Sequence, residues 1–317
     1  MLQPINSSFK GKDIVSLDQF NRASILRLFK EAKILKKIPT KKLLNVLKGK
    51  IATLIFFEPS TRTFSSHSVA FKKLGGQTIE YQNPLSTSSS VKGETIEDTV
   101  RVFEQYADVI VVRHPTKGTL KKVADAVRIP VINAGDGIGE HPTQALLDLF
   151  TVWEKHKKLD NLKVLMAGDL LNGRTVHSLI RGLSMFPKNT IYLLSPKQLR
   201  LSKDDFEAFS KKGVKLVEIY SAKDIPTDCH FWYWTRVQKE RFNDKKEYEK
   251  LKLSFVLTKK LVDEKAGKIT LLMHPLPRVG EVETELDSDY RAVYLTDEVK
   301  NGMYIRMALF KLILKTS

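Results

Sequence analysis

A run of four polar residues, Ser60, Thr61, Arg62 and Thr63, lies between an apolar stretch and a helical pattern. This order predicts a strand, a tight loop and a helix. The first amides of a helix have no internal partners, and the helix dipole attracts anions to that end. The hydroxyls add donors, and Arg62 adds a planar fork that fits phosphate oxygens. We interpret the run as a phosphate site, although Ser and Thr at a helix start also serve as ordinary N-caps.

Similar polar clusters follow other apolar runs along the chain. They are Arg113, His141-Pro142-Thr143-Gln144, Arg174, Arg236-Val237-Gln238 and His274-Pro275-Leu276-Pro277-Arg278. The clusters supply cations, histidine, hydroxyls and glutamine, with no Ser-His-Asp or Cys-His pairing, Gly-rich nucleotide loop or metal-ligand spacing. Such a set would bind anions and stabilise a developing oxyanion. Transfer of a group from a phosphate to an amine fits, because the departing phosphate can take the amine's proton.

Strand patterns alternate with helical patterns in both halves of the chain. The strands are expected at 51–57, 77–81, 108–113, 130–134, 163–167, 191–194, 215–217, 231–233 and 269–273. This alternation predicts an α/β fold of two domains, each a mainly parallel sheet flanked by helices. Ligands of such sheets bind beyond the carboxyl ends of the strands, which is where the polar clusters stand.

Two further segments have clear local signals. Ser16-Leu17-Asp18-Gln19 has the pattern of a capping box and is expected to open the first long helix. The apolar face of that helix would comprise Ile25, Leu28, Ala32 and Leu35. Residues 84–93 are small, polar and rich in Ser, so we expect a mobile loop.

Length and composition favour a soluble globular protein. The chain has 317 residues, with 42% hydrophobic and 28% charged residues. Its apolar runs are shorter than the ~18 residues of a membrane helix, and the N-terminus lacks an apolar signal core, so we expect a cytoplasmic protein that does not span a membrane. The single cysteine, Cys229, excludes an internal disulfide and a multi-cysteine metal site and is expected to be a buried, inert thiol.

The formal net charge is +17. Nucleic-acid binding would require a basic face with interleaved aromatic residues or a known recognition motif. Because the lysines are scattered instead, we expect most of them to form a solvated surface. Steering of small anionic substrates is the functional alternative. We therefore expect no nucleic-acid partner.

The motifs together resemble the carbamoyltransferase family. The resemblance rests on Ser60-Thr61-Arg62-Thr63, Val112-Arg113-His114-Pro115, His141-Pro142-Thr143-Gln144, the segments 168–178 and 235–241, and His274-Pro275-Leu276-Pro277-Arg278. The last motif is similar to the aspartate branch, since the ornithine branch has a cysteine-containing version there. The resemblance extends from about Lys50 to Arg306.

The resemblance implies a role for each matching residue. The phosphate of carbamoyl phosphate would be bound by Ser60, Thr61, Arg62, Thr63 and Ser88. The carbamoyl oxygen would be polarised by Arg113, His141 and Thr63. The carbamoyl nitrogen would be held by Gln144 and the backbone carbonyls of Pro275 and Leu276. The carboxylates of aspartate would be bound by Lys92, Arg174, Arg236 and Gln238. The residues acting in catalysis would be Arg62, Thr63, Lys92, Arg113 and His141.

The resemblance also implies an architecture and an assembly. Residues 1–142 and 292–317 would bind carbamoyl phosphate, and residues 143–291 would bind aspartate. The family forms trimers, in which Ser88 and Lys92 would reach the active site of a neighbouring subunit. The Leu276–Pro277 peptide is expected to be cis. In the closed state, charges would pair across the domain gap through Glu58, Arg241 and Glu247.

The implied activity is transfer of the carbamoyl group of carbamoyl phosphate to L-aspartate, a step of pyrimidine biosynthesis that uses no metal or organic cofactor. The alternatives are a carbamoyltransferase for another amine such as ornithine, or an inactive paralogue that binds anions or RNA. Whether a regulatory chain binds remains open. The chain departs from the family's usual residues at His67, Val91 and Gly280. The histidines expected to be structural are His67, His114, His156, His177 and His230.

Overall fold

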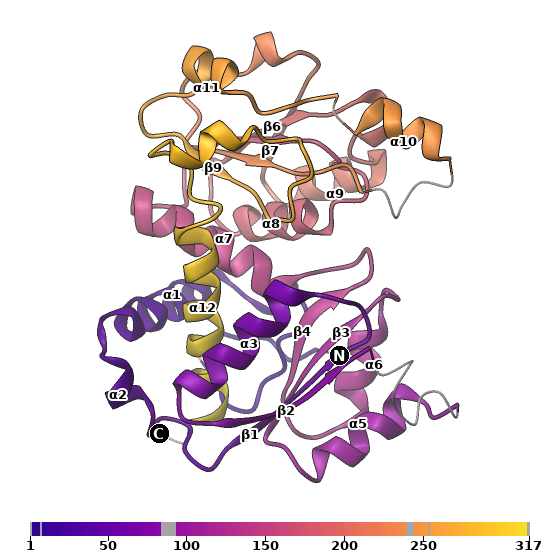
Figure 1. The fold of residues 1–317 in the computed structure, drawn as a ribbon, viewed down its shortest axis with the longest axis vertical. Helices are drawn as coiled ribbons and strands as arrows, with labels where there is room; N and C mark the ends of the chain where they lie inside the picture. The colour runs from indigo at the N-terminus through magenta and orange to yellow at the C-terminus, as the bar shows by residue number, and fades with distance from the viewer. Residues whose placement is uncertain (1, 7, 84–92, 239–243, 253, 316–317) are drawn as a thin grey trace. The chain divides into compact units, whose positions relative to one another are not determined.

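The computed structural model describes residues 2–6, 8–83, 93–238, 244–252 and 254–315. These residues form two units, Met1–Leu147 with Asn301–Ser317 and Asp148–Lys300 (Figure 1). The chain passes from one unit to the other within α7 (Pro142–His156) and again within α12 (Asp297–Leu314). Ser88, Val91, Lys92 and Arg241 lie outside the described residues, as does the side chain of Glu247.

The N-terminal segment corrects one expectation from the sequence. The Ser16 capping box closes only a short 3-10 turn, η1 (Leu17–Gln19), and not the first long helix. That helix, α1 (Arg22–Lys37), has a second capping box of its own, in which Asn21 and Ser24 cap each other's backbone. Because capping is local, the sequence shows where a cap can form but not how long the capped helix is. A single turn, α2 (Thr40–Leu43), follows.

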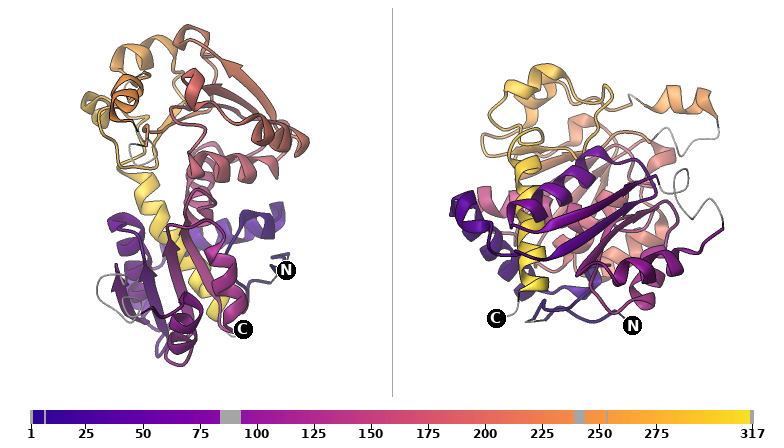
Figure 2. Two further views of the ribbon diagram at one scale, coloured as in Figure 1. Left: turned by 90° about the vertical axis from the view of Figure 1, so that its right-hand side faces the viewer. Right: turned by 60° about the horizontal axis from the view of Figure 1, so that its bottom comes forward.

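The first unit contains a sheet of four parallel strands in the order β2-β1-β3-β4. The strands are β1 (Ile51–Phe56), β2 (Gln77–Gln82), β3 (Val109–His114) and β4 (Val131–Asp136). They lie side by side in the right-hand view of Figure 2. The central strand β3 is buried from Val109 to Val112, as expected for a parallel sheet that is covered on both faces.

Helices cover both faces of this sheet. On one face, α5 (Ile96–Glu104) and α6 (Thr119–Ala126) pack through Val100 and Val123 against Ile110 and Val112. On the other face lie α3 (Thr61–Lys73) and the part of α12 from Asn301 onward, where Phe310 makes an edge contact with Phe71 at 4.9 Å. The alternating side chains of the strands therefore enter two separate apolar layers.

The second unit contains a sheet of five parallel strands in the order β7-β6-β5-β8-β9. The strands are β5 (Lys163–Ala167), β6 (Thr190–Leu194), β7 (Lys215–Ile219), β8 (Phe231–Trp234) and β9 (Leu271–Met273). All four residues of β8 are buried. This burial explains why its sequence is uniformly aromatic rather than alternating.

The helices of the second unit also lie on both faces of its sheet. They are the part of α7 from Asp148 onward, α8 (Arg174–Ser184), α9 (Lys203–Lys211), α10 (Lys245–Leu251) and α11 (Lys259–Lys265), with short turns η3 (Lys197–Leu199), η4 (Ala222–Asp224) and η6 (Thr284–Ser288). One apolar layer joins Val262 of α11 and Leu286 of η6 to Trp232 and Trp234. Gly182 of α8 lies so close to α7 that a Cβ atom added to it would be 2.5 Å from the Leu149 side chain. The absence of a side chain at Gly182 therefore allows the two helices to approach closely.

The predicted fold class is confirmed: both units are parallel sheets flanked by helices. No helix within the described part of the chain is long and apolar enough to cross a bilayer.

Candidate active site

In the first unit, three predicted site segments end neighbouring strands. Phe56 of β1 is paired with Arg113 of β3, and His114 is paired with Asp136 of β4. Since the strands are parallel, their carboxyl ends lie at one edge of the sheet. The start of α3, the side chain of Arg113 and the loop that leads to His141 therefore share that edge.

The start of α3 has no side-chain cap. Ser60 is the N-cap residue, but with φ −158° and ψ 83° its hydroxyl makes no capping hydrogen bond. The ordinary N-cap alternative therefore does not account for Ser60. Thr61 and Arg62 are exposed and Thr63 is buried. The polar run thus offers the amides of a helix start, a guanidinium and hydroxyls at one place.

Arg113 is held by Glu58 and by a backbone carbonyl. Its Nη2 lies 3.0 Å from Glu58 Oε2, and its Nη1 donates to the carbonyl of Ala134 over 3.3 Å. Its side chain is 11% exposed and that of Glu58 is 25% exposed. Burial, more than the positive charge of Arg62, lowers the pKa of Arg113 from its ordinary value. The guanidinium stays charged, because an arginine pKa lies far above neutral pH.

His141 is buried at the start of α7, next to Thr143. The Thr143 hydroxyl lies 3.5 Å from His141 Nδ1 and accepts a 3.3 Å hydrogen bond from Nη2 of Arg306. With Arg306 as its donor, the Thr143 hydroxyl can direct its own proton at Nδ1. With that direction of the contact, a neutral imidazole would carry its proton on Nε2. Nη1 of Arg306 donates to Ser66 of α3, so one arginine connects both helix starts.

Glu140, the residue before His141, is bonded to the N-terminal segment. Its carboxylate accepts hydrogen bonds from the Ser16 hydroxyl at 2.7 Å and from the Leu17 amide at 2.9 Å. Nearby, the Asn133 side-chain amide donates to the Val15 carbonyl. The N-terminal segment therefore supports the loop that carries His141.

His67 lies in α3, behind the polar run, and is fully buried. Its Nδ1 hydrogen donates to the Thr63 carbonyl at 2.8 Å, which leaves Nε2 without a hydrogen-bond partner among the described residues. Burial, and next the charge of Arg306, lower the pKa of His67 well below its ordinary value. Phe56 and Phe310 make edge contacts with the ring. The predicted structural role of His67 agrees with these contacts.

In the second unit, the residues predicted to bind aspartate and the two predicted to hold the carbamoyl nitrogen also follow neighbouring strands. Arg174 follows β5, Arg236 and Gln238 follow β8, and Pro275 and Leu276 follow β9; all five are half-buried. Because β5, β8 and β9 are adjacent and parallel, these loops lie at one edge of the second sheet.

Gly168 allows the loops after β5 and β8 to meet. It has φ +113°, and a side chain there would lie 2.1 Å from the Thr235 carbonyl oxygen. Only glycine fits this position. Gln238 then donates to the Asn172 carbonyl at 3.0 Å, and Asp169 accepts from the Asn172 amide at 2.9 Å. Burial raises the pKa of Asp169 despite these donors.

His274 and Glu281 fix the loop after β9. Nε2 of His274 donates to Glu281 at 2.8 Å, and Nδ1 accepts the Leu276 amide at 2.8 Å. Burial lowers the pKa of His274, whereas the hydrogen bonds from His274 and the Val279 amide outweigh burial and lower the pKa of Glu281. A neutral imidazole therefore bonds an ionised carboxylate. The Leu276–Pro277 peptide is cis, as predicted.

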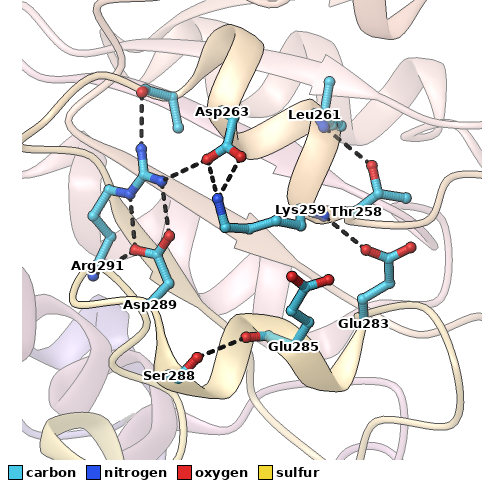
Figure 3. Close-up of polar contacts among 10 residues, drawn as sticks. Thr258, Lys259, Leu261, Asp263, Glu283, Glu285, Ser288, Asp289 and Arg291 are labelled. Carbon is cyan, nitrogen blue, oxygen red and sulfur yellow. Dashed lines mark hydrogen bonds and ion pairs between the residues drawn. The ribbon is translucent and has the colours of Figure 1, made fainter.

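The segment after this loop is fixed by ion pairs (Figure 3). Arg291 forms a forked pair with Asp289, with Nε and Nη2 at 2.9 and 2.8 Å, and its Nη1 donates to the Ala266 carbonyl at 3.0 Å. Asp263 of α11 pairs with Lys259 and approaches Arg291 at 3.7 Å. Through Arg291, these contacts join α11 to the segment that contains Asp289 and Arg291.

His156, His230 and Cys229 lie away from these edges, at the end of α7 and before the start of β8. His156 and His230 bond backbone groups around β5 and β8, and burial lowers the pKa of both. Cys229 is buried, as predicted, and burial raises its pKa to about 12. Within the described ranges, no three His, Cys, Asp or Glu side chains are grouped in a way that could hold a metal ion.

Two protein-family models match the chain. The carbamoyl-P binding domain of the aspartate/ornithine carbamoyltransferases matches residues 12–154, and their Asp/Orn binding domain matches residues 160–313. The chain belongs to the aspartate/ornithine carbamoyltransferase family. The family predicted from the motifs is thereby confirmed.

Individual relatives in the carbamoyltransferase family cover nearly the whole chain. The aspartate carbamoyltransferase catalytic subunit of Methanobrevibacter smithii is 42% identical over 310 residues, which is 98% of this chain and 96% of that protein. The catalytic subunit of M. jannaschii aspartate transcarbamoylase has a TM-score of 0.87 and 42% identity, covering 94% of this chain and 96% of that one. The Trypanosoma cruzi enzyme in complex with carbamoyl phosphate and aspartate has a TM-score of 0.89 and 36% identity, covering 99% and 100%.

The sequence analysis did not identify the residues that support these edges. They are Glu140, which bonds Ser16; Asp148, which accepts the Tyr233 hydroxyl; Asp169, which accepts the Asn172 amide; Glu281, which bonds His274; Glu298, which accepts the His274 amide; and Arg306, which bonds Thr143. Asp148 has a visible signal, because it interrupts an apolar run between Leu147 and Leu149. The others have no local signal that separates them from surface charges.

Proposed function

We propose that this chain transfers the carbamoyl group of carbamoyl phosphate to the amine of L-aspartate. The amine nitrogen attacks the carbamoyl carbon, and the bond from that carbon to the phosphate oxygen breaks. The amine loses a proton to the departing phosphate, so the products are N-carbamoyl-L-aspartate and phosphate. The observation that carries the proposal is that each sheet has the family's anion-binding residues at one edge, within a chain that matches named aspartate carbamoyltransferases over nearly its full length.

The first unit would bind carbamoyl phosphate. Ser60, Thr61, Arg62 and Thr63 would hold the phosphate. Arg113 and His141, with Thr63, would donate to the carbamoyl oxygen, where negative charge develops during attack. A proton on Nε2 of His141, as its contact with Thr143 favours, suits this role.

Binding would require Arg113 to change partners. In this structure its Nη2 forms an ion pair with Glu58 Oε2 at 3.0 Å, and the Glu58 side chain is 25% exposed. A substrate oxygen would compete with this carboxylate for the guanidinium, and water can hydrate Glu58 once the pair opens.

The second unit would bind aspartate. Two guanidinium groups, Arg174 and Arg236, match the two carboxylates of this substrate, and Gln238 adds an amide. The backbone carbonyls of Pro275 and Leu276, together with Gln144, would hold the carbamoyl nitrogen. We propose residues 1–142 with 292–317, and 143–291, as the two substrate-binding domains. The structure divides the chain a few residues away, at 147/148 and 300/301.

We also propose a homotrimer in which Ser88 and Lys92 serve the active site of a neighbouring subunit. The support is the family resemblance of these residues. Native mass spectrometry tests the assembly, and a monomer that is fully active would contradict it.

The activity is tested by measuring carbamoyl-aspartate formation from purified protein, beside ornithine as the alternative acceptor. We expect turnover with aspartate and none with ornithine. Arg236→Ala should raise the KM for aspartate far more than that for carbamoyl phosphate, because a carboxylate then loses its partner. Arg101→Ala on α5 is the matched control, since Arg101 is exposed and pairs with Asp98.

Turnover of ornithine alone would reject the aspartate proposal. Inactivity with every amine, together with intact folding, would favour the inactive anion-binding or RNA-binding alternative. A cytoplasmic location is a separate proposal, tested by cell fractionation. Recovery in an organelle would contradict it, and some relatives are named as chloroplastic.

A further inference from the structure

Two carboxyl groups lie deep in the second unit, away from the predicted substrate contacts. Asp148 belongs to α7 and Glu298 to α12, and they are 0% and 2% exposed. Acidic side chains are rarely buried this completely unless hydrogen bonds or neighbouring charges compensate them. Their partners therefore need to be identified.

Each carboxyl group receives a hydrogen bond from a neighbouring strand end. The Tyr233 hydroxyl donates to Asp148 Oδ2 at 2.9 Å, and the His274 amide donates to Glu298 Oε2 at 3.2 Å. The second oxygen of Glu298, Oε1, is buried and has no donor among the described residues. An ionised Glu298 would leave this oxygen unsatisfied, at a substantial cost.

A proton on Glu298 resolves that deficit. Two ionised carboxylates contain only acceptors, so they repel and cannot bond each other. Once one carries a proton, its O–H can donate to the other. Burial first, and then the charge of Asp148, raise the pKa of Glu298 well above its ordinary value. Asp148 is the better anion, because it accepts the Tyr233 hydroxyl and, within the described chain, neither of its oxygens is a buried atom that lacks a partner, unlike Oε1 of Glu298.

We propose that Glu298 is protonated at neutral pH, donates its proton to ionised Asp148 in a hydrogen bond, and thereby positions the His274-Pro275-Leu276 backbone for its substrate. Glu298 and Asp148 are positioning residues here, not groups that touch substrate. The part of this inference that concerns substrate rests on the proposed function, in which Pro275 and Leu276 hold the carbamoyl nitrogen.

The pair occupies a central place among the site loops. Thr175, which follows the proposed aspartate ligand Arg174, hydrogen-bonds the Tyr233 hydroxyl. The connection then runs through Tyr233 to Asp148, on to Glu298, and to the His274 amide. It therefore links the start of α8 to the loop after β9 through buried groups. Such a chain fixes the relative positions of its ends only if every member is satisfied.

Three variants of Glu298 test the proposal. Glu298→Gln keeps a donor toward Asp148 and an acceptor for the His274 amide, so we expect kcat/KM within about threefold of wild type. Glu298→Met keeps the length but loses both bonds, and Glu298→Ala also loses the volume. For these two we expect kcat/KM for carbamoyl phosphate to fall about ten- to a hundredfold, since small misplacements of positioning groups have effects of this size.

Glu264→Met serves as the control, since Glu264 lies 56% exposed on α11. It should leave all parameters unchanged. Equal losses in Glu298→Gln and Glu298→Met would overturn the proposal, because the hydrogen-bonding isostere would then give no rescue.

Infrared difference spectroscopy measures the proton directly. Wild type at pH 8 should show the carbonyl band of a protonated carboxyl group, and Glu298→Gln should lack it. Absence of that band from the wild type would overturn the proposal even if the variants fold poorly. The spectrum does not depend on turnover. If the wild-type protein proves inactive, the proposed function is rejected, and the carbonyl band still shows whether Glu298 is protonated.

Discussion

Removal of the Arg113 guanidinium should separate its catalytic contribution from its structural one. In Arg113→Ala, the carbamoyl oxygen loses a charged donor at the position where negative charge develops. Loss of one such donor typically costs about 10²- to 10³-fold in kcat, or about 2.7–4 kcal/mol. Glu58 would lose its partner at the same time, but its side chain is 25% exposed and can be hydrated. We therefore expect the free energy of unfolding to fall by about 1–3 kcal/mol.

The assay compares initial rates of carbamoyl-aspartate formation with unfolding in urea. Arg113→Lys is the informative second variant, because lysine keeps the charge but lacks the fork that reaches Glu58 and the Ala134 carbonyl together. It should fall between wild type and Arg113→Ala. Arg101→Ala, which removes an arginine that is 59% exposed, is the control for a change in net charge.

Two results would refute this reasoning. An Arg113→Ala protein with kcat within about threefold of wild type would show that the guanidinium does not stabilise the transition state. A loss of several kcal/mol in unfolding free energy would show that the fall in rate reflects damage to the fold.

Three further predictions concern other parts of the molecule. Burial and the charge of Arg306 lower the pKa of His67, so on acidification the unfolded chain takes up a proton at His67 before the folded protein does. The stability of His67→Phe should therefore follow that of wild type above about pH 6.5 and exceed it by up to about 1.4 kcal/mol per pH unit below pH 6.5. Urea unfolding between pH 5 and 8 measures the difference, and parallel stability curves over this whole range would contradict the prediction. Gly168→Ala should lower the free energy of unfolding by about 3 kcal/mol or more, because the new side chain would meet the Thr235 carbonyl. The control Gly213→Ala, at φ +89° with nothing nearby, should lower it by only about 1–2 kcal/mol. Equal losses of the two variants in thermal unfolding would reject the steric argument. Lys92→Ala and His141→Ala should each be nearly inactive on their own. If Lys92 serves a neighbouring subunit, oligomers reassembled from equal parts of the two variants should regain roughly a quarter of the active sites. No recovery in verified mixed oligomers would mean that Lys92 serves the active site of its own subunit or is only a surface charge.

Much of the candidate site was predictable because its signals are local. The Ser60–Thr63 run, Arg113, His141, Arg174, Arg236 and the 274–278 motif each lie at the end of an apolar strand pattern or in the loop after it. Parallel strands necessarily bring such positions to one edge of a sheet. The periodicity of the strands and helices was therefore enough to give the fold class and to place each cluster at a strand end.

Local patterns were less reliable where two interpretations share one signal. The Ser16 box has every feature of a helix start, yet it caps only a turn, and Asn21 opens α1. Conversely, Ser60 has the composition of an N-cap but makes no capping bond. A cap pattern specifies one hydrogen bond, while the continuation of the chain depends on what packs against it.

The tertiary structure alone decided which charges are buried together. Asp148 and Glu298 are far apart in sequence, and no local pattern pairs them, yet the packing of α7 and α12 in the second unit places both beside β8 and β9. The same holds for Arg306 with Ser66 and Thr143, and for Glu140 with Ser16. The sequence by itself placed the predicted site residues at strand ends, because short-range spacing shows where each strand stops. Their support was decided by long-range packing, since the pKa and the hydrogen-bond partners of a buried charge depend on neighbours that come from distant parts of the chain.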